Sequence, residues 1–465
     1  MTSFKLSIAA AMALFAMWAP SAVCAADVAI QSFTLKNGME VVLLENHRVP
    51  AVTHMLWYRV GGADDYPGRS GLAHYNEHMM FQGTDKIKGG EFSHRVVSHG
   101  GRENAFTSRD YTGYYVSIAK EHLPMVMAME ADRMLHLAPT KENFAKERQV
   151  IIEERRMSID NQPAALLAEE MQAMLYRNHP YHTPLIGWMH EMEALSREDV
   201  LAFHKQFYHP ANAVLVVAGD ITHKELEALA EKYYGTLSAG EKYVRHWRSE
   251  PPQRASRHIS MTHVNVNEPQ LTRSYVAPSV NTQDKAQVMP LYLLAQILGG
   301  GESSRLYQSL VVNQKIATNV DVGYNGLSIG PGQMEISAIP AEGVTLPALE
   351  AAIDKEIILV TKELQSDDML ARAKTLLKAD VVYARDGMES IARLEGMFLM
   401  AGLPVDYINQ WPSLIDNVTA EDMRKAAGTV FDPANSVTGY LLPEPGEGGT
   451  KRKAAPIQLP AKEIR

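Results

Sequence analysis

Two stretches of this chain, 223 residues apart, repeat one local pattern without a gap. They run from Glu198 to Val214 and from Glu421 to Val437. In each, an acidic pair opens a helical stretch, Pro-Ala-Asn ends it, and an apolar run predicts a strand. Alternating segments at 111–118 and 333–339 also match, each followed by a helical stretch. The sequence therefore predicts an α+β protein of two duplicated, α/β-sandwich-like domains, with long helices against one face of each sheet.

Length and composition set the expected boundaries. Roughly 440 mature residues are too many for one ordinary core, which favours two domains. Gly240, Pro251, Pro252 and several charges interrupt both periodicities between the repeats. The expected segments are a signal peptide at 1–25, a first domain at 26–240, a linker at 241–257, a second domain at 258–445 and a flexible tail at 446–465.

The first residues are typical of a secretory signal. Lys5 precedes an apolar stretch at 6–19, and small residues allow cleavage after Ala25 or Ala26. We expect export across the inner membrane to the periplasm; a lipid anchor on Cys24 is the alternative. Since the chain has one cysteine, cleavage leaves no disulfide and no thiol catalyst. No later apolar run is long enough to span a bilayer.

Charge argues against a nucleic-acid partner. The chain has 54 acidic and 45 basic side chains and a net charge of -9. It has no long basic run, which is the usual footprint of nucleic-acid binding.

One short motif carries chemistry. His74 and His78 are four residues apart, so on a helix they project from one face and can share a Zn²⁺ ion. Glu77 lies between them, where it can act on the attacking water. The bare motif arises by accident in on the order of a few per cent of such chains, but the helix has apolar residues to bury, and Ser70 and Gly71 can open it. The pattern predicts a zinc hydrolase.

A catalytic zinc needs a third protein ligand and one open position. Glu154 is the candidate, and Glu147 lies two turns earlier on the same face of a helix expected to begin near Thr140. The alternative is that these glutamates and their arginine neighbours form a solvated, salt-bridged surface.

The whole mature chain resembles a known family. The resemblance is carried by the H-x-x-E-H order at 74–78, the segment 150–154, the intervening segment 100–108 and the glycine-rich segment 298–306. These features are similar to those of the pitrilysin-type inverzincin metallopeptidases, specifically the zinc-bearing subunit of the mitochondrial-processing-peptidase-like branch. The resemblance implies the LuxS/MPP-like metallohydrolase fold and one zinc ion per chain.

The resemblance also implies roles for single residues. His74, His78 and Glu154 would bind zinc, Glu77 would be the general base, and Glu147 would support the ligands from behind. A further set would hold an extended peptide by adding it to the edge of a sheet: Asn104, Ala105 and Thr107.

One departure from the family pattern concerns the second half. Members commonly carry an arginine and, seven residues on, a tyrosine that hold the substrate and the oxyanion. Val311 and Thr318 stand at those positions here, and Arg305 and Tyr324 are nearby but misplaced. We expect a homologous subunit to supply the pair in a heterodimer, with a homodimer as the fallback.

Two functional classes remain open. The first is an exported zinc endopeptidase that cleaves unfolded peptides, as one subunit of a two-chain chamber. The second is a non-catalytic structural or assembly subunit of the same fold. The intact set at residues 74, 77, 78 and 154 favours the first, and a metal-storing module would have no need of Glu77.

Overall fold

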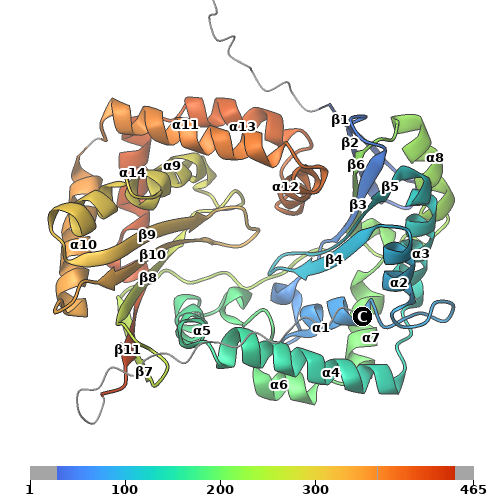
Figure 1. The fold of residues 1–465 in the computed structure, drawn as a ribbon, viewed down its shortest axis with the longest axis horizontal. Helices are drawn as coiled ribbons and strands as arrows, with labels where there is room; N and C mark the ends of the chain where they lie inside the picture. The colour runs from blue at the N-terminus through green and yellow to red at the C-terminus, as the bar shows by residue number, and fades with distance from the viewer. Residues whose placement is uncertain (1–28, 364, 446–465) are drawn as a thin grey trace, which may run out of the picture.

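The computed structural model describes residues 29–363 and 365–445, which fold around two β-sheets that lie at opposite ends of the molecule (Figure 1). The expected signal peptide at 1–25 and tail at 446–465 lie outside the described residues. Within the described ranges, no helix combines the length and the apolar character needed to cross a membrane.

The first sheet has six strands. In spatial order they are β1 (Ile30–Thr34), β2 (Glu40–Glu45), β6 (Ala213–Gly219), β3 (Ala51–Tyr58), β5 (Thr112–Ala119) and β4 (Arg102–Thr107). Only the β2 and β6 pair is parallel. Strand β4 pairs with β5 alone, so its other side is a free edge.

The second sheet repeats this arrangement with five strands. They are β7 (Arg257–His263), β11 (Ser436–Pro443), β8 (Gln270–Ala277), β10 (Gly332–Pro340) and β9 (Ala317–Asn325). The β7 and β11 pair is parallel and the rest are antiparallel, as in the run β2, β6, β3, β5 and β4 of the first sheet. The predicted duplication and α+β class are confirmed.

The repeated sequence pattern builds the same local structure twice. Ser196 caps α7 (Arg197–Phe207) and Thr419 caps α14 (Ala420–Val430), each through a reciprocal capping box with an aspartate three residues later. In both copies a single 3₁₀ turn at Pro-Ala-Asn leads into the strand β6 or β11. Local capping chemistry is therefore sufficient to set these matching boundaries.

Helices make up the remaining layers. The first half contains α1 (Leu72–Met79), α2 (Glu91–Ser98), α3 (Leu123–His136), α4 (Lys141–Arg155), α5 (Pro163–Leu175), α6 (Met189–Ala194) and α8 (His223–Tyr233). The second half contains α9 (Val288–Gly299), α10 (Leu346–Lys362), α11 (Asp367–Ala384), α12 (Met388–Met400) and α13 (Tyr407–Asp416).

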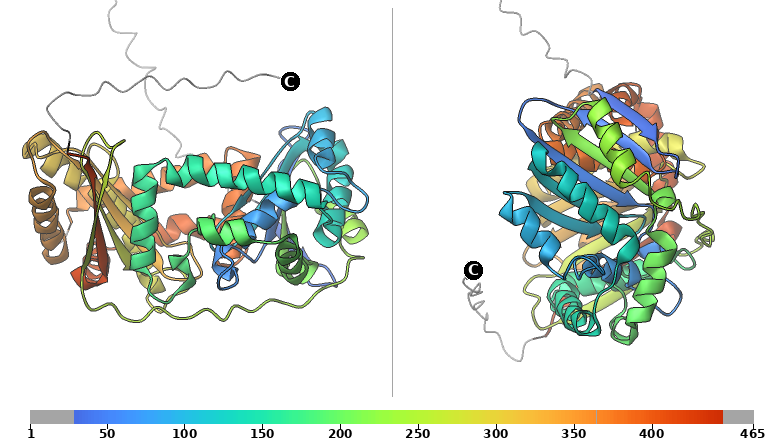
Figure 2. Two further views of the ribbon diagram at one scale, coloured as in Figure 1. Left: turned by 90° about the horizontal axis from the view of Figure 1, so that it is seen from below. Right: turned by 90° about the vertical axis from the view of Figure 1, so that its right-hand side faces the viewer.

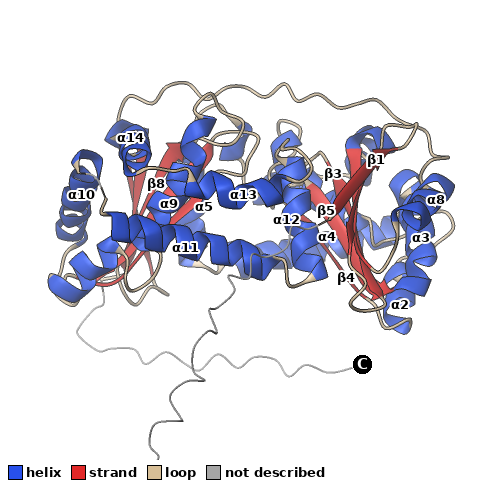
Figure 3. Cartoon of the chain, turned by 90° about the horizontal axis from the view of Figure 1, so that it is seen from above, coloured by secondary structure: helices blue, strands red, loops and turns tan. Residues whose placement is uncertain are grey.

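The expectation that helices cover one face of each sheet is wrong, because each half lends a helix to the other. Helix α5 packs on β11 of the second sheet, and α12 packs on β6 and β3 of the first (Figures 1 and 3). Strand β6 shows the physical reason. Its Leu215 and Val217 belong to the core on one face, and its Val214 and Val216 belong to the core that includes α12. A strand that is apolar on both sides needs two covering layers.

The connection between the halves runs along the outside of the molecule (Figure 2). It has neither helix nor strand between 238 and 256, and it is tied to the first half by the buried carboxylate of Asp64. That carboxylate accepts hydrogen bonds from the Tyr243 hydroxyl at 3.1 Å, from Arg245 at 2.9 Å and from the Trp247 indole at 3.0 Å. The segment is therefore a fixed strap rather than a free tether.

Candidate metal centre

The helix that carries the H-x-x-E-H motif begins at a turn that requires glycine. Gly71, the residue before α1, has φ of 86°, the left-handed region. The Asp65 carboxylate accepts from the N–H groups of Gly71 at 2.6 Å and Ala73 at 2.8 Å, which satisfies the first turn. The expected capping by the Ser70 hydroxyl is wrong, because that oxygen accepts from the Trp188 N–H at 2.8 Å instead.

Packing fixes α1 against α4, the helix that carries both glutamates. The Tyr75 and Phe144 rings stack with centroids 4.9 Å apart, and the Tyr75 hydroxyl donates to the Phe144 carbonyl at 3.1 Å. Helix α4 begins directly after Thr140, as predicted, and the Thr140 hydroxyl caps it. This contact holds α1 beside α4, so that the histidines of α1 and the glutamates of α4 can meet.

The structure brings His74, His78 and Glu154 together. Their nearest ligand atoms all lie within 4.8 Å of one another. His78 Nε2 lies 3.2 Å from one Glu154 oxygen and His74 Nε2 lies 3.7 Å from the other. Ligand atoms of a tetrahedral zinc site are about 3.3 Å apart, so this donor set fits such an ion and leaves a fourth position open. Among the residues described, no other cluster of three or more His, Cys, Asp or Glu side chains has this geometry.

The electrostatic environment differs between the two histidines of the centre. Burial and, to a lesser extent, the neighbouring His78 together lower the pKa of His74 to about 4. Burial also opposes the charged form of His78, but hydrogen bonds to Glu147 and Glu154 outweigh it and raise the pKa of His78 to about 9. The same contact with His78 lowers the pKa of Glu154. A bound cation therefore has to displace a proton from His78.

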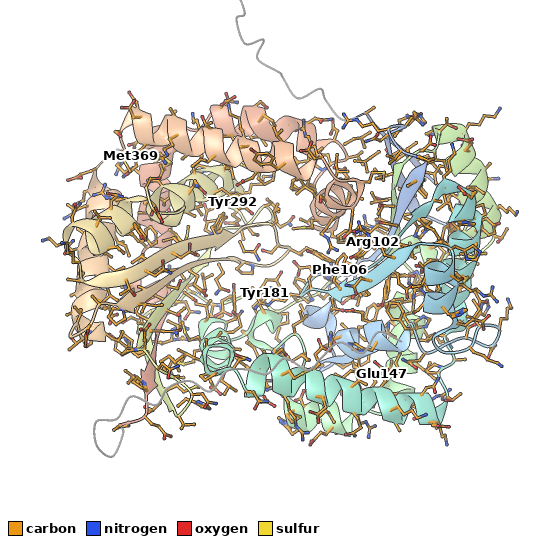
Figure 4. All side chains as sticks on the ribbon, viewed as in Figure 1. Arg102, Phe106, Glu147, Tyr181, Tyr292 and Met369 are labelled. Carbon is orange, nitrogen blue, oxygen red and sulfur yellow. The ribbon has the colours of Figure 1, made fainter. Side chains whose placement is uncertain are left out.

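Glu147 orients the ring of His78, one of the candidate ligands, through a hydrogen bond. Its Oε1 lies 2.8 Å from His78 Nδ1, which leaves Nε2 of that ring for the open centre. Its other oxygen accepts from Gln82 Nε2 at 2.7 Å. Figure 4 shows Glu147 on α4, at the side facing the interior. The solvated salt-bridge reading holds for Glu153, which pairs with Arg156 at 2.6 Å, and does not describe Glu147.

Glu77 is a half-buried carboxylate beside the three candidate ligands. Burial raises the pKa of Glu77, while a hydrogen bond donated by the Thr107 hydroxyl opposes the rise. A carboxylate with a raised pKa is suited to exchange a proton with water near neutral pH. The sequence predicts Thr107 only as part of the substrate strand, and spacing along the chain does not reveal its contact with Glu77.

The strand expected to hold the substrate is β4, the free edge of the first sheet. The Asn104 side chain is exposed, and its Oδ1 accepts from the Ala105 N–H at 2.9 Å. Ala105 is half-buried and packs against the first core. β4 contacts α1, and Thr107 reaches Glu77, so the free edge begins beside the candidate centre.

A cavity of about 480 Å³ adjoins the centre. Its walls come from both halves, with His74, Arg109 and Glu154 from the first and Gln333 and Glu335 from the second. No motif in the sequence predicts the place of Arg109 in this wall. The spacing of the motif also does not reveal Gln82, which lies in the turn after α1 and donates to Glu147.

Comparisons with known proteins agree with this geometry. The chain matches the model of the insulinase (peptidase family M16) domain over residues 40–188 and that of the peptidase M16 inactive domain over residues 194–377. The first match contains the H-x-x-E-H motif and Glu154. The second covers most of the half without a metal motif.

Relatives cover nearly the whole chain. It is 29% identical over 424 residues to the zinc protease PqqE of Helicobacter pylori, covering 89% of this chain and 93% of the relative. A crystal structure of a protease from Helicobacter pylori superposes with a TM-score of 0.84 at 27% identity, covering 90% of this chain and all of that one. The first half of the periplasmic protease PqqL from Escherichia coli shares the fold, with a TM-score of 0.74 at 20% identity and coverage of 89% and 92%.

Both domain matches, the full-length relative and the shared fold point to one family. The chain belongs to the peptidase M16 family, the insulinase-like or pitrilysin type.

Proposed function

We propose that this chain is a zinc-dependent endopeptidase that cleaves unfolded peptides bound in an extended conformation. The observation that carries the proposal is the convergence of His74, His78 and Glu154 beside Glu77, at the wall of a cavity. Relatives named zinc proteases support the choice of metal and reaction.

In the proposed reaction, the ligand set holds one zinc ion, which supplies Lewis acidity toward the scissile carbonyl and the attacking water. Glu77 takes a proton from that water and later delivers it to the leaving amine. Thr107 holds the Glu77 carboxylate in place through its hydroxyl. Glu147 keeps His78 in the tautomer that offers Nε2.

The free edge of β4 would bind the substrate backbone as an added strand. Asn104, Ala105 and Thr107 belong to this edge strand, and its end lies beside Glu77. Main-chain hydrogen bonds depend little on side-chain identity, so this mode suits a broad range of unfolded peptides.

We also propose that a homologous subunit completes the site in a two-chain chamber. Val311 packs against the second core, and Thr318 is exposed on β9. Neither side chain has a guanidinium or a phenol group that could hold the substrate and the oxyanion. Arg305 pairs with Glu356 at 3.3 Å, and the Tyr324 hydroxyl donates to a backbone carbonyl at 2.7 Å, so both are already engaged. A homodimer is the fallback.

Export to the periplasm is part of the proposal. It is supported by the signal-like first residues of the sequence and by the shared fold of PqqL, which is described as periplasmic. Fractionation of cells that express the full chain, followed by N-terminal sequencing, tests it.

The test of the chemistry is Glu77→Gln. The variant should keep zinc, measured by metal analysis, and lose turnover of an unfolded peptide by about 10² to 10⁴-fold. The matched control is Glu153→Gln, an exposed glutamate on α4 that should leave both readouts unchanged. Turnover that survives Glu77→Gln would overturn the assignment of the base.

The test of the subunit proposal compares the chain purified alone with the chain co-expressed with a homologous subunit. Activity should rise strongly in the pair. Full activity of the isolated monomer would refute the two-chain chamber, and no activity in either sample with zinc bound would favour the non-catalytic subunit.

A further inference from the structure

Arg109 lies in the short turn that joins the edge strand β4 to β5. The turn is fixed by its backbone, since the Ser108 N–H donates to the Tyr111 carbonyl at 2.7 Å and the Ala63 N–H donates to the Arg109 carbonyl at 2.9 Å. The position of this arginine is therefore set by the fold and does not depend on a mobile loop.

The Arg109 side chain is held over an aromatic ring. Its guanidinium carbon lies 5.4 Å from the centroid of the Tyr181 ring. The Tyr181 hydroxyl in turn donates to the Asp110 carboxylate and accepts from the Gly330 N–H of the second half at 2.9 Å. Figure 4 shows Tyr181 between the two halves of the molecule. The ring gives the guanidinium a rigid support at the place where both halves meet.

The charged groups of the cavity next to the candidate centre are unequally paired. Glu169 is bound by Arg155 through two contacts of 2.8 Å. Glu335 accepts from the Ser274 hydroxyl at 3.0 Å and from Gln333 at 3.3 Å. Glu154 belongs to the candidate ligand set.

Arg109 differs from these carboxylates. Within residues 29–363 and 365–445, no carboxylate oxygen lies within 4.0 Å of its guanidinium, which lies over the Tyr181 ring. The wall of the same cavity also contains apolar side chains such as Ile159, Leu185 and Ile186. A cation in such surroundings gains most from an anionic partner that enters with the ligand.

We infer that Arg109 binds a carboxylate of the peptide substrate and makes this enzyme selective for substrates that carry one close to the scissile bond. The inference rests on the proposed peptidase function. A guanidinium matches a carboxylate with two parallel hydrogen bonds, which a neutral amide cannot reproduce. The carboxylate is either an acidic side chain or the free C-terminus of the peptide.

The register of the edge strand sets where this carboxylate lies. Thr107 contacts Glu77, and Arg109 follows Thr107 by two residues. The Cα atoms of Thr107 and Arg109 are therefore at most about 7 Å apart. A peptide paired with β4 therefore reaches Arg109 within about two residues of the bond next to Glu77. The preference should be confined to those subsites.

The experiment compares matched peptides that carry Glu or Gln at each position flanking the cleaved bond, each with a free or an amidated C-terminus. For the wild type with zinc, kcat/KM should be at least about tenfold higher for the peptide with the carboxylate at one subsite. Arg109→Gln should remove that preference, and Arg109→Lys should keep part of it. Arg95→Gln, a change of an exposed arginine on α2, should keep all of it.

The arms of the experiment separate the sources and the failures. A preference that follows the Glu peptides identifies a side-chain carboxylate, and one that follows the free C-terminus identifies the terminal carboxylate. Equal cleavage of all peptides by the wild type overturns the inference and leaves the proposed peptidase intact. A uniform loss for all peptides in Arg109→Gln also overturns it, since the arginine then only supports the turn.

Binding gives a readout that does not need turnover. The zinc-loaded Glu77→Gln variant should bind the carboxylate peptide at least about tenfold tighter than its amide partner by fluorescence anisotropy. Adding Arg109→Gln should abolish the difference. If no peptide is cleaved by any form, the proposed function fails, and the binding difference alone then supports or overturns the role of Arg109.

Discussion

Replacing Glu147 by Gln is expected to weaken zinc binding through its effect on a single ring nitrogen. The carboxylate accepts from His78 Nδ1 at 2.8 Å and from Gln82 Nε2 at 2.7 Å. An amide at position 147 has one oxygen and one NH₂ group, so it can accept from only one of these two donors. The His78 ring loses either its partner or the charge that makes the partner strong.

The magnitude follows from what such partners contribute. Loss of an outer partner of a metal-binding histidine costs about 10 to 100-fold in metal affinity, which corresponds to about 1.4–2.8 kcal/mol. The full loss is expected at pH 9 and above. At pH 7 the loss of zinc affinity should be smaller. Glu147 helps to raise the pKa of His78 to about 9, so in the variant a smaller fraction of His78 is protonated and zinc has to displace a proton less often.

The assay is competition for zinc between the protein and a chromophoric chelator at pH 7 and pH 9. Glu153→Gln is the matched control, since Glu153 lies on the same helix but is exposed and pairs with Arg156. The control should bind zinc like the wild type at both pH values. Affinity of Glu147→Gln within twofold of the wild type at pH 9 would refute the reasoning.

Two further predictions concern α12, the helix that the second half lends to the first sheet. A methyl group added at Gly396 would overlap the Trp57 indole ring, so Gly396→Ala should lower the free energy of unfolding, measured in urea, by about 1–3 kcal/mol. The control is Gly428→Ala on α14, which has open space around it and should raise the free energy of unfolding by up to about 1 kcal/mol. Equal effects of the two substitutions would contradict the packing of α12 on Trp57. Burial raises the pKa of Glu395 from 4.5 to about 7, so the folded protein binds a proton at Glu395 more tightly than the unfolded chain does. The contribution of this proton to the free energy of unfolding is full below about pH 4.5 and is lost as the pH rises through 7. The wild type should therefore lose on the order of 3 kcal/mol relative to Glu395→Gln between pH 5 and pH 8, and parallel stability curves would count against it.

The local structure around the candidate site could be predicted from the sequence. The four-residue spacing of His74 and His78 is a property of one helix, and the capping residues at 196 and 419 act within one turn. Ser70 shows the limit of such reasoning. A serine before a helix is a good cap, but a carboxylate six residues before Gly71 took the position instead, and the serine bonded to Trp188.

By itself, the sequence determined the duplication, the α+β class and the shared helix of His74, Glu77 and His78, because these depend on spacing and periodicity within single elements. Glu154 lies on a second helix, and the packing of α4 against α1 brings it to the histidines. Tertiary structure alone decided the exchange of α5 and α12, the contact of Thr107 with Glu77, and the place of Arg109 in the cavity wall. These contacts join segments far apart in the chain. Their geometry depends on how whole apolar faces pack against one another, and no local pattern encodes that.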